Sequence, residues 1–174
     1  GLGPKMCEMA AEVADGLAVM PVTSERYFES HTMASVRTGV ARRDASMGAL
    51  EVLPELIVCT GRTEEEMAVA DAGCRGLIGF YSSTPAYRPV FELEGYGDIQ
   101  PVARGFTKEG RWDELADLIE GPLLERIAVR GTPKEVAAQI GRRYGQHTDR
   151  VAVYLPYGAG QDLVAELVDE LHAV

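Results

Sequence analysis

The sequence has no long hydrophobic run, an acidic balance of charge and few cysteines. A membrane-spanning helix needs about 20 consecutive apolar residues, and the apolar runs of this chain are far shorter. The N-terminus lacks the basic stretch and following apolar run of a signal peptide. The 17 Lys and Arg residues against 27 Asp and Glu residues give a net charge of −10, which disfavours nucleic-acid binding. We therefore expect a cytoplasmic protein that binds neither membranes nor nucleic acids.

The sequence also lacks the usual residue sets for disulfides, metals and nucleophilic catalysis. Its three cysteines, Cys7, Cys59 and Cys74, lie far apart and include no C-x-x-C pair, which is typical of reduced, buried thiols. None of the three histidines has a partner at metal-ligand spacing. No Ser-His-Asp or Cys-His set can be assembled. We expect no metal, assign no catalytic residue, and infer that the chemistry comes from a cofactor.

What the sequence does contain is an alternation of strand and helix patterns. At 174 residues with 46% hydrophobic composition, it is long enough for one domain with a substantial core. Strands are predicted at residues 17–20, 55–59 and 150–155, the second starting after Pro54, which cannot donate to a sheet. This order indicates an α/β protein with parallel strands. Because parallel strands normally have neighbours on both sides, three strands predict an incomplete domain that needs a partner.

Several helix starts are clearly marked. Residues 132–135, Thr-Pro-Lys-Glu, combine a capping box with proline at the first helical position, and Thr63 to Glu66 form a second capping box. Further helices are predicted at residues 25–43, 112–119, 122–131 and 161–172. Residues 82–110 show little periodicity and many Pro and Gly residues, which predicts an insertion or lid before the last strand.

The first residues of the chain form a glycine turn that leads into a helix. Pro4 suits the first helical position, and the helix then presents Met6, Met9, Ala10 and Val13 at a spacing that predicts a buried face. Free N–H groups at Lys5 and Met6 would lie at the positive end of the helix dipole. The turn therefore has the properties of an anion-binding site.

Several short motifs in this order resemble one family. The sequence Gly3-Pro4-Lys5-Met6, followed by AEVADGL at residues 11–17, is similar to the GPKM…AGEVADGL pattern of bacterial luciferase-like flavin and deazaflavin oxidoreductases. The stretches YRPVFE (87–92), GD (97–98) and VRGTPKEV (129–136) resemble the later half of the same family. The resemblance covers nearly the whole chain. Ala11 stands where the family often has glycine.

This resemblance implies a (β/α)8 TIM barrel, of which residues 1–174 would be a single partial domain, the C-terminal half. It implies hydride transfer between the deazaflavin coenzyme F-420 and a small organic substrate, with an FMN-dependent monooxygenase as the alternative. The residues that it places at the cofactor phosphate are Gly1, Leu2, Gly3, Pro4, Lys5 and Met6.

Two further hypotheses remain beside this one. The chain could be a non-catalytic half-barrel that associates with a partner, or a barrel enzyme that binds a sugar phosphate without a redox cofactor. We expect a homo-oligomer, or association with a missing N-terminal half, and an inactive protein if the chain is alone.

Active sites of such barrels lie at the carboxyl ends of the strands. The substrate-side candidates at these ends are Met20, Thr23, Thr60, Arg62 and Tyr157. Arg62 could bind an anionic group or lie on the surface before a capped helix, and Met20 and Tyr157 could line the barrel mouth.

Overall fold

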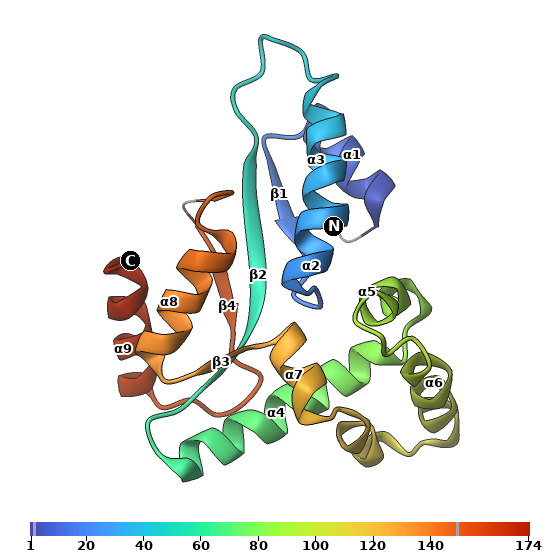
Figure 1. The fold of residues 1–174 in the computed structure, drawn as a ribbon, viewed down its shortest axis with the longest axis vertical. Coiled ribbons are helices and arrows are strands. Elements are labelled where there is room, and N and C mark those ends of the chain that lie inside the picture. Colours follow the sequence, from blue (N-terminus) through green and yellow to red (C-terminus); the bar gives the residue numbers. More distant parts are fainter. Residues whose placement is uncertain (2, 149) are drawn as a thin grey trace.

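The computed structural model describes residues 1, 3–148 and 150–174. Its four parallel strands are β1 (Gly16–Val19), β2 (Glu51–Thr60), β3 (Val129–Gly131) and β4 (Ala152–Tyr154). The long β2 is the centre of the sheet, as Figure 1 shows. It pairs with β1 through residues 51–54, with β4 through residues 55–57 and with β3 through residues 58–60.

Helices connect and cover these strands. They are α1 (Pro4–Val13), α2 (Glu25–Tyr27), α3 (Met33–Val40), α4 (Glu64–Ser82), α5 (Arg88–Leu93), α6 (Ile99–Glu109), α7 (Gly121–Ile127), α8 (Pro133–Tyr144) and α9 (Gln161–His172). A π-helical turn, Phe28–Thr32, joins α2 to α3. None of the helices in the described residues is long and apolar enough to cross a membrane.

The prediction that Pro54 precedes the second strand was wrong, because β2 runs through it. The N–H of Glu51 donates to the Asp15 carbonyl on the β1 side, 3.0 Å away. Since backbone groups alternate between the two edges of a strand, the nitrogen of Pro54 faces the opposite edge. Pairing with β4 begins there only at Glu55, so the missing donor of Pro54 interrupts no ladder.

Three other segments differ from the prediction. The helix predicted to reach residue 131 ends at Ile127, and the chain becomes extended at Ala128 (φ −90°, ψ 152°) before β3. Residues 112–119 form two 3₁₀ turns, Trp112–Glu114 and Ala116–Leu118, rather than one helix. Residues 82–110 are largely helical, because α5 and α6 lie within them. That they act as a lid stays a prediction.

One face of the sheet is covered by helices. The apolar side chains of β1 and β2 that point to this face include Leu17, Val19, Leu56 and Val58, all buried. They pack against α1, α3, α8 and α9, which Figure 1 shows along the two sides of β2. Helices surround the outside of a (β/α)8 barrel, so this face corresponds to a barrel's outer surface.

The opposite face is open along its amino-terminal part. Ala18 is exposed, Glu55 is half-buried and Tyr154 is 49% exposed. Toward the carboxyl end of β2, Ile57 and Cys59 are buried in a second core cluster to which α4 contributes. Side chains on this face would point into the interior of a closed barrel. The described chain thus has the layers of part of a barrel.

Helix α1 buries a different face from the one predicted. Met6, Met9 and Val13 are 54%, 53% and 61% exposed, whereas Cys7 and Ala11 are fully buried. The face of α1 that carries the small side chains of Cys7 and Ala11, here called the small face, lies against α3. A Cβ added to Gly39 of α3 would stand 2.1 Å from the Glu8 carbonyl oxygen. Close contact with α3 therefore decides which face of α1 is buried.

Candidate functional site

The glycine turn lies beside the carboxyl end of β1. The Met20 N–H donates to the Gly1 carbonyl at 3.1 Å, and the amino group of Gly1 donates to the Ala18 carbonyl. These two bonds extend the sheet by one residue next to β1. Because α1 begins directly after Gly3, its N-terminus is at the sheet edge where the strands end.

The turn is accessible, but its N–H groups are not all free. Gly3, Pro4, Lys5 and Met6 are exposed, and among the described residues no side chain caps α1. The N–H groups of Met6 and Cys7 both donate to the Gly3 carbonyl, at 3.0 and 3.1 Å. The prediction of a free N–H at Met6 was therefore wrong. Leu2 lies outside the described residues.

A Cβ added to Gly3 would meet no atom of the described residues within 4 Å, its chain neighbours aside. Gly3 also has an ordinary extended backbone, φ −66° and ψ 143°, that other residues adopt readily. The space next to Gly3 is thus open for a ligand to approach the backbone, as a phosphate group at a helix N-terminus requires. In this respect the turn fits the phosphate of a flavin-like cofactor.

Of the five substrate-side candidates, the structure brings Thr60 and Tyr157 together. The Tyr157 hydroxyl donates to the Thr60 carbonyl at 3.2 Å and accepts the Thr60 N–H at 3.0 Å. Burial raises the pKa of Tyr157 despite its bond to the Thr60 backbone. This pair ties the loop after β4 to the end of β2. The buried Thr60 Oγ1 has no hydrogen-bond partner among the described residues.

The other candidates have local partners. Arg62 forms an ion pair with Glu66 at 2.6 Å, and the Arg62 N–H also donates to this carboxylate. Thr23 is buried, and its hydroxyl donates to the Ser24 carbonyl at 3.4 Å. Met20 is partly buried against the second core cluster. Arg62 has the environment of a surface ion pair, which was the second of the two roles considered for it.

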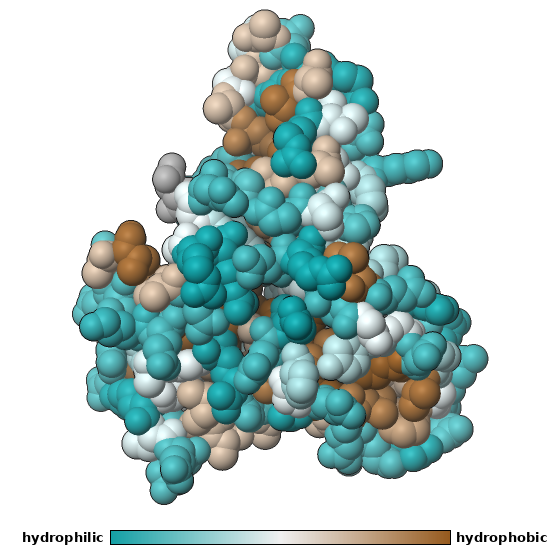
Figure 2. Space-filling model, in the orientation of Figure 1, coloured by the Kyte–Doolittle hydropathy of each residue, from teal (hydrophilic) through white to brown (hydrophobic). Residues whose placement is uncertain are grey.

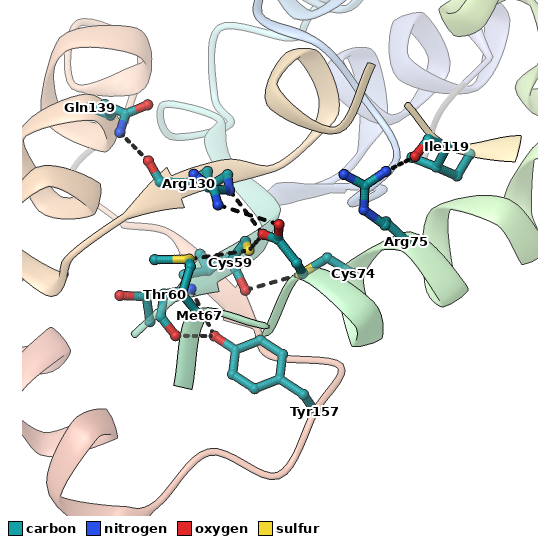
Figure 3. Close-up of polar contacts among 11 residues, drawn as sticks. Cys59, Thr60, Met67, Cys74, Arg75, Ile119, Arg130, Gln139 and Tyr157 are labelled. Carbon is teal, nitrogen blue, oxygen red and sulfur yellow. Dashed lines mark hydrogen bonds and ion pairs between the residues drawn. The ribbon is translucent and has the colours of Figure 1, made fainter. Parts of the chain in front are cut away.

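A polar network that the sequence did not predict connects β2, β3 and α4. Arg130 donates to Asp71 from Nε at 2.9 Å and from Nη2 at 3.3 Å. The Cys59 thiol donates to the same carboxylate at 3.0 Å, and the Gln139 amide donates to the Arg130 carbonyl at 2.7 Å. Figure 3 shows Arg130 and Tyr157 on opposite sides of Cys59.

The network keeps its carboxylate charged and its thiol neutral. Burial alone would raise the pKa of Asp71, but hydrogen bonds from Arg130 and Cys59 outweigh it and lower the pKa. The contact with Cys74, burial and Asp71 all raise the pKa of Cys59. Cys59 is therefore a protonated hydrogen-bond donor, not a nucleophile. The described residues hold no group of three or more His, Cys, Asp or Glu arranged to bind a metal ion.

Asp71 and Arg130 were missed because they are 59 positions apart. Asp71 lies on a long helix where an exposed acid is ordinary, and Arg130 belongs to a strand of three residues. The sequence offered one local signal for Arg130. The capping box at Thr132 marks the start of α8, so Arg130, two residues earlier, could be placed at the end of the preceding segment.

Comparison with known proteins gives consistent results. A family model described as luciferase-like monooxygenase matches residues 1–150. Uncharacterized proteins of Mycobacterium bovis and Mycobacterium tuberculosis are 37% identical over 150 residues, which are 86% of this chain and 44% of each relative. The chain thus spans about half the length of the curated relatives that it matches.

Two solved structures are also similar. The coenzyme F-420-dependent tetrahydromethanopterin reductase of Methanopyrus kandleri has a TM-score of 0.70 at 15% identity, covering 98% of this chain and 48% of the reductase. The EDTA monooxygenase of Chelativorans sp. has a TM-score of 0.45 at 19% identity, covering 98% of this chain and 42% of that protein. The first likeness confirms an α/β fold similar to part of a luciferase-like TIM barrel. With the family model matched over most of its residues, this chain belongs to the luciferase-like monooxygenase family.

Proposed function

We propose that a protein containing this chain transfers a hydride between coenzyme F-420 and a small organic substrate. The observation that carries this proposal is the position of the glycine turn. Its backbone bonds to Met20 at the carboxyl end of β1, where enzymes with barrel folds bind their ligands. In the described part of the chain, no side chain caps α1, and a Cβ on the exposed Gly3 would meet no atom within 4 Å apart from its chain neighbours.

In this proposal the residues of the turn bind and orient the cofactor. Gly3 admits the cofactor phosphate to the backbone, and Lys5 contributes positive charge at the same helix end. When bound, the deazaflavin ring supplies the hydride chemistry. The side chains of Met20 and Tyr157 line the substrate side, and the bond between Tyr157 and Thr60 holds the last loop of the site in place.

FMN is the alternative cofactor, with a monooxygenase reaction. The name of the Methanopyrus kandleri reductase includes coenzyme F-420, and that protein shares the fold at a TM-score of 0.70. We choose F-420 for this reason and for the motif resemblance of the first residues. The two cofactors differ in absorbance and fluorescence, so the same experiment tests both.

The experiment is a titration of purified protein containing this chain with F-420 and, separately, with FMN. Saturable quenching of cofactor fluorescence by F-420, with weaker or no quenching of FMN, is the expected result. Preference for FMN would replace the reductase proposal with the monooxygenase. Binding of neither cofactor would refute both.

A second candidate function is that of a non-catalytic half-barrel that associates with another polypeptide. The observation that favours it is the open sheet face, where Ala18 and Tyr154 are exposed. A sheet edge or face without cover favours association with another chain. Sedimentation of the 174-residue chain tests this: the hypothesis expects dimers or larger species, and a dispersed, folded monomer would contradict it.

A further inference from the structure

A charged cavity of about 380 Å³ lies near the carboxyl end of β1. Residues from α2, α7, β3 and α8 line it, and Figure 2 shows a hollow in a hydrophilic area between these elements. Its lining includes four arginines, Arg26, Arg126, Arg130 and Arg143, and three glutamates. Four of the 17 basic side chains of an acidic protein thus meet in one cavity, where Asp71 beside Arg130 brings the number of carboxylates also to four.

The guanidinium groups of this cavity have donors to spare. The Nε of Arg143 is buried and has no hydrogen-bond partner among the described residues, although the Glu25 carboxylate is 3.4 Å away. Arg130 bonds Asp71 through Nε and Nη2, which leaves Nη1 for another acceptor. Arg143 donates to the Gln139 amide oxygen from Nη2 at 3.0 Å, which leaves its Nη1 for another acceptor.

The most buried glutamate side chain of the cavity does not supply a further acceptor. The Glu94 side chain is 1% exposed and accepts a hydrogen bond from the Ser24 hydroxyl at 2.7 Å. Arg26 and Arg126 are 3.7 and 3.8 Å from it, beyond hydrogen-bonding distance. Glu94 therefore holds the two guanidinium groups nearby without occupying their N–H donors.

We propose that this cavity binds an oxyanion, the phosphate or carboxylate group of the substrate, through Arg126, Arg130 and Arg143. The planar fork of a guanidinium matches two oxygens of such a group. The cavity reaches Ser24, four residues after Met20, so its ligand lies at the same strand end as the glycine turn. Its assignment to the substrate rests on the proposed hydride-transfer function.

The test uses the 174-residue chain with inorganic phosphate and acetate as probes, at constant ionic strength set with sodium chloride. Binding is followed from the Nε–H signals of the arginines in nitrogen–proton NMR spectra. We expect saturable shifts of the Arg143 signal, and binding weaker by at least about fivefold in Arg126→Gln and Arg143→Gln. Arg37→Gln, at an exposed position on α3 outside the cavity, is the matched control and should bind as the wild type does.

Two results would overturn the inference: shifts no larger than those with chloride, or equal weakening by Arg37→Gln. Arg126 is 61% exposed, so Arg126→Gln keeps the test valid if Arg143→Gln does not fold. F-420 affinity in Arg126→Gln separates substrate from cofactor, because protein containing this chain should bind F-420 equally well as the wild type and as this variant. Weaker F-420 binding by Arg126→Gln would overturn the substrate assignment. Phosphate binding by the cavity together with a failure of protein containing this chain to bind F-420 would refute the proposed function and with it that assignment.

Discussion

Replacing Gly39 by alanine tests the packing that places the glycine turn. A Cβ at this position would lie 2.1 Å from the Glu8 carbonyl oxygen and 2.7 Å from the Ala11 Cβ, and real Cβ contacts are rarely below 3.0 Å. Helices α1 and α3 would have to separate by about 0.9 Å or more, because the clashing atom is backbone. The glycine turn begins α1, so the shift would also displace the turn.

The size of the effect follows from two opposing contributions. Overpacking costs about 1–3 kcal/mol, and a clash with backbone belongs to the upper part of this range. Alanine in place of glycine returns about 1 kcal/mol through helix propensity. We expect a net loss of about 1–2 kcal/mol, which lowers the melting temperature by about 2–8 °C for a chain of this size.

Thermal unfolding followed by circular dichroism measures this loss. The matched control is Gly76→Ala, also inside a long helix, where a Cβ would meet no atom within 4 Å. This control should stabilise the protein by about 0.5–1 kcal/mol. Equal melting temperatures for the two variants would refute the reasoning that α1 and α3 depend on a glycine at their contact.

Two further predictions concern the network around Asp71. Asp71→Asn should destabilise the protein by about 1–3 kcal/mol at pH 7, because it leaves Arg130 without its charged acceptor. Because the pKa of Asp71 is lowered, the destabilisation by Asp71→Asn is fully present above the ordinary carboxyl pKa of about 4 and vanishes as the pH falls through the lowered pKa. Urea unfolding of the wild type and the variant, at pH 7 and at a pH below the lowered pKa, measures this difference. The same loss of stability at both pH values would contradict the prediction. Cys59 should resist a thiol reagent at pH 8 until the protein unfolds, because it is buried and its pKa is raised; rapid labelling of the folded protein at Cys59, identified by peptide mass, would count against this.

The sequence predicted those elements whose signals are local. The capping box at Thr132 and Glu135 is present with both of its hydrogen bonds, and α9 has the predicted limits. At Thr63 only half of the predicted capping box forms, because the Glu66 carboxylate accepts the N–H of Arg62 instead. Caps depend on residues within one turn of helix, which a sequence displays directly.

The elements that were missed depend on distant residues. β3 has three residues, too few for a periodic pattern, and it is a strand because it pairs with the end of β2. The exposed Met6 and Met9 could be seen only once α3 was in place against the small face of α1. The same distinction holds for the candidate site. The glycine turn could be predicted because its residues are adjacent in the sequence, whereas Asp71 and Arg130 come together only in the folded chain.

The most direct test of the proposed function compares F-420 affinity in the wild type, Gly3→Val and Gly48→Val. Both glycines are exposed, and at each an added Cβ would meet no atom of the described residues within 4 Å beyond the chain neighbours. Gly48, however, precedes β2 at the opposite end of the sheet. Fluorescence titration of protein containing this chain should give at least about tenfold weaker binding for Gly3→Val, with the melting temperature nearly unchanged. Gly48→Val should bind as the wild type does. Equal F-420 affinity in all three proteins would contradict the placement of the cofactor at the glycine turn.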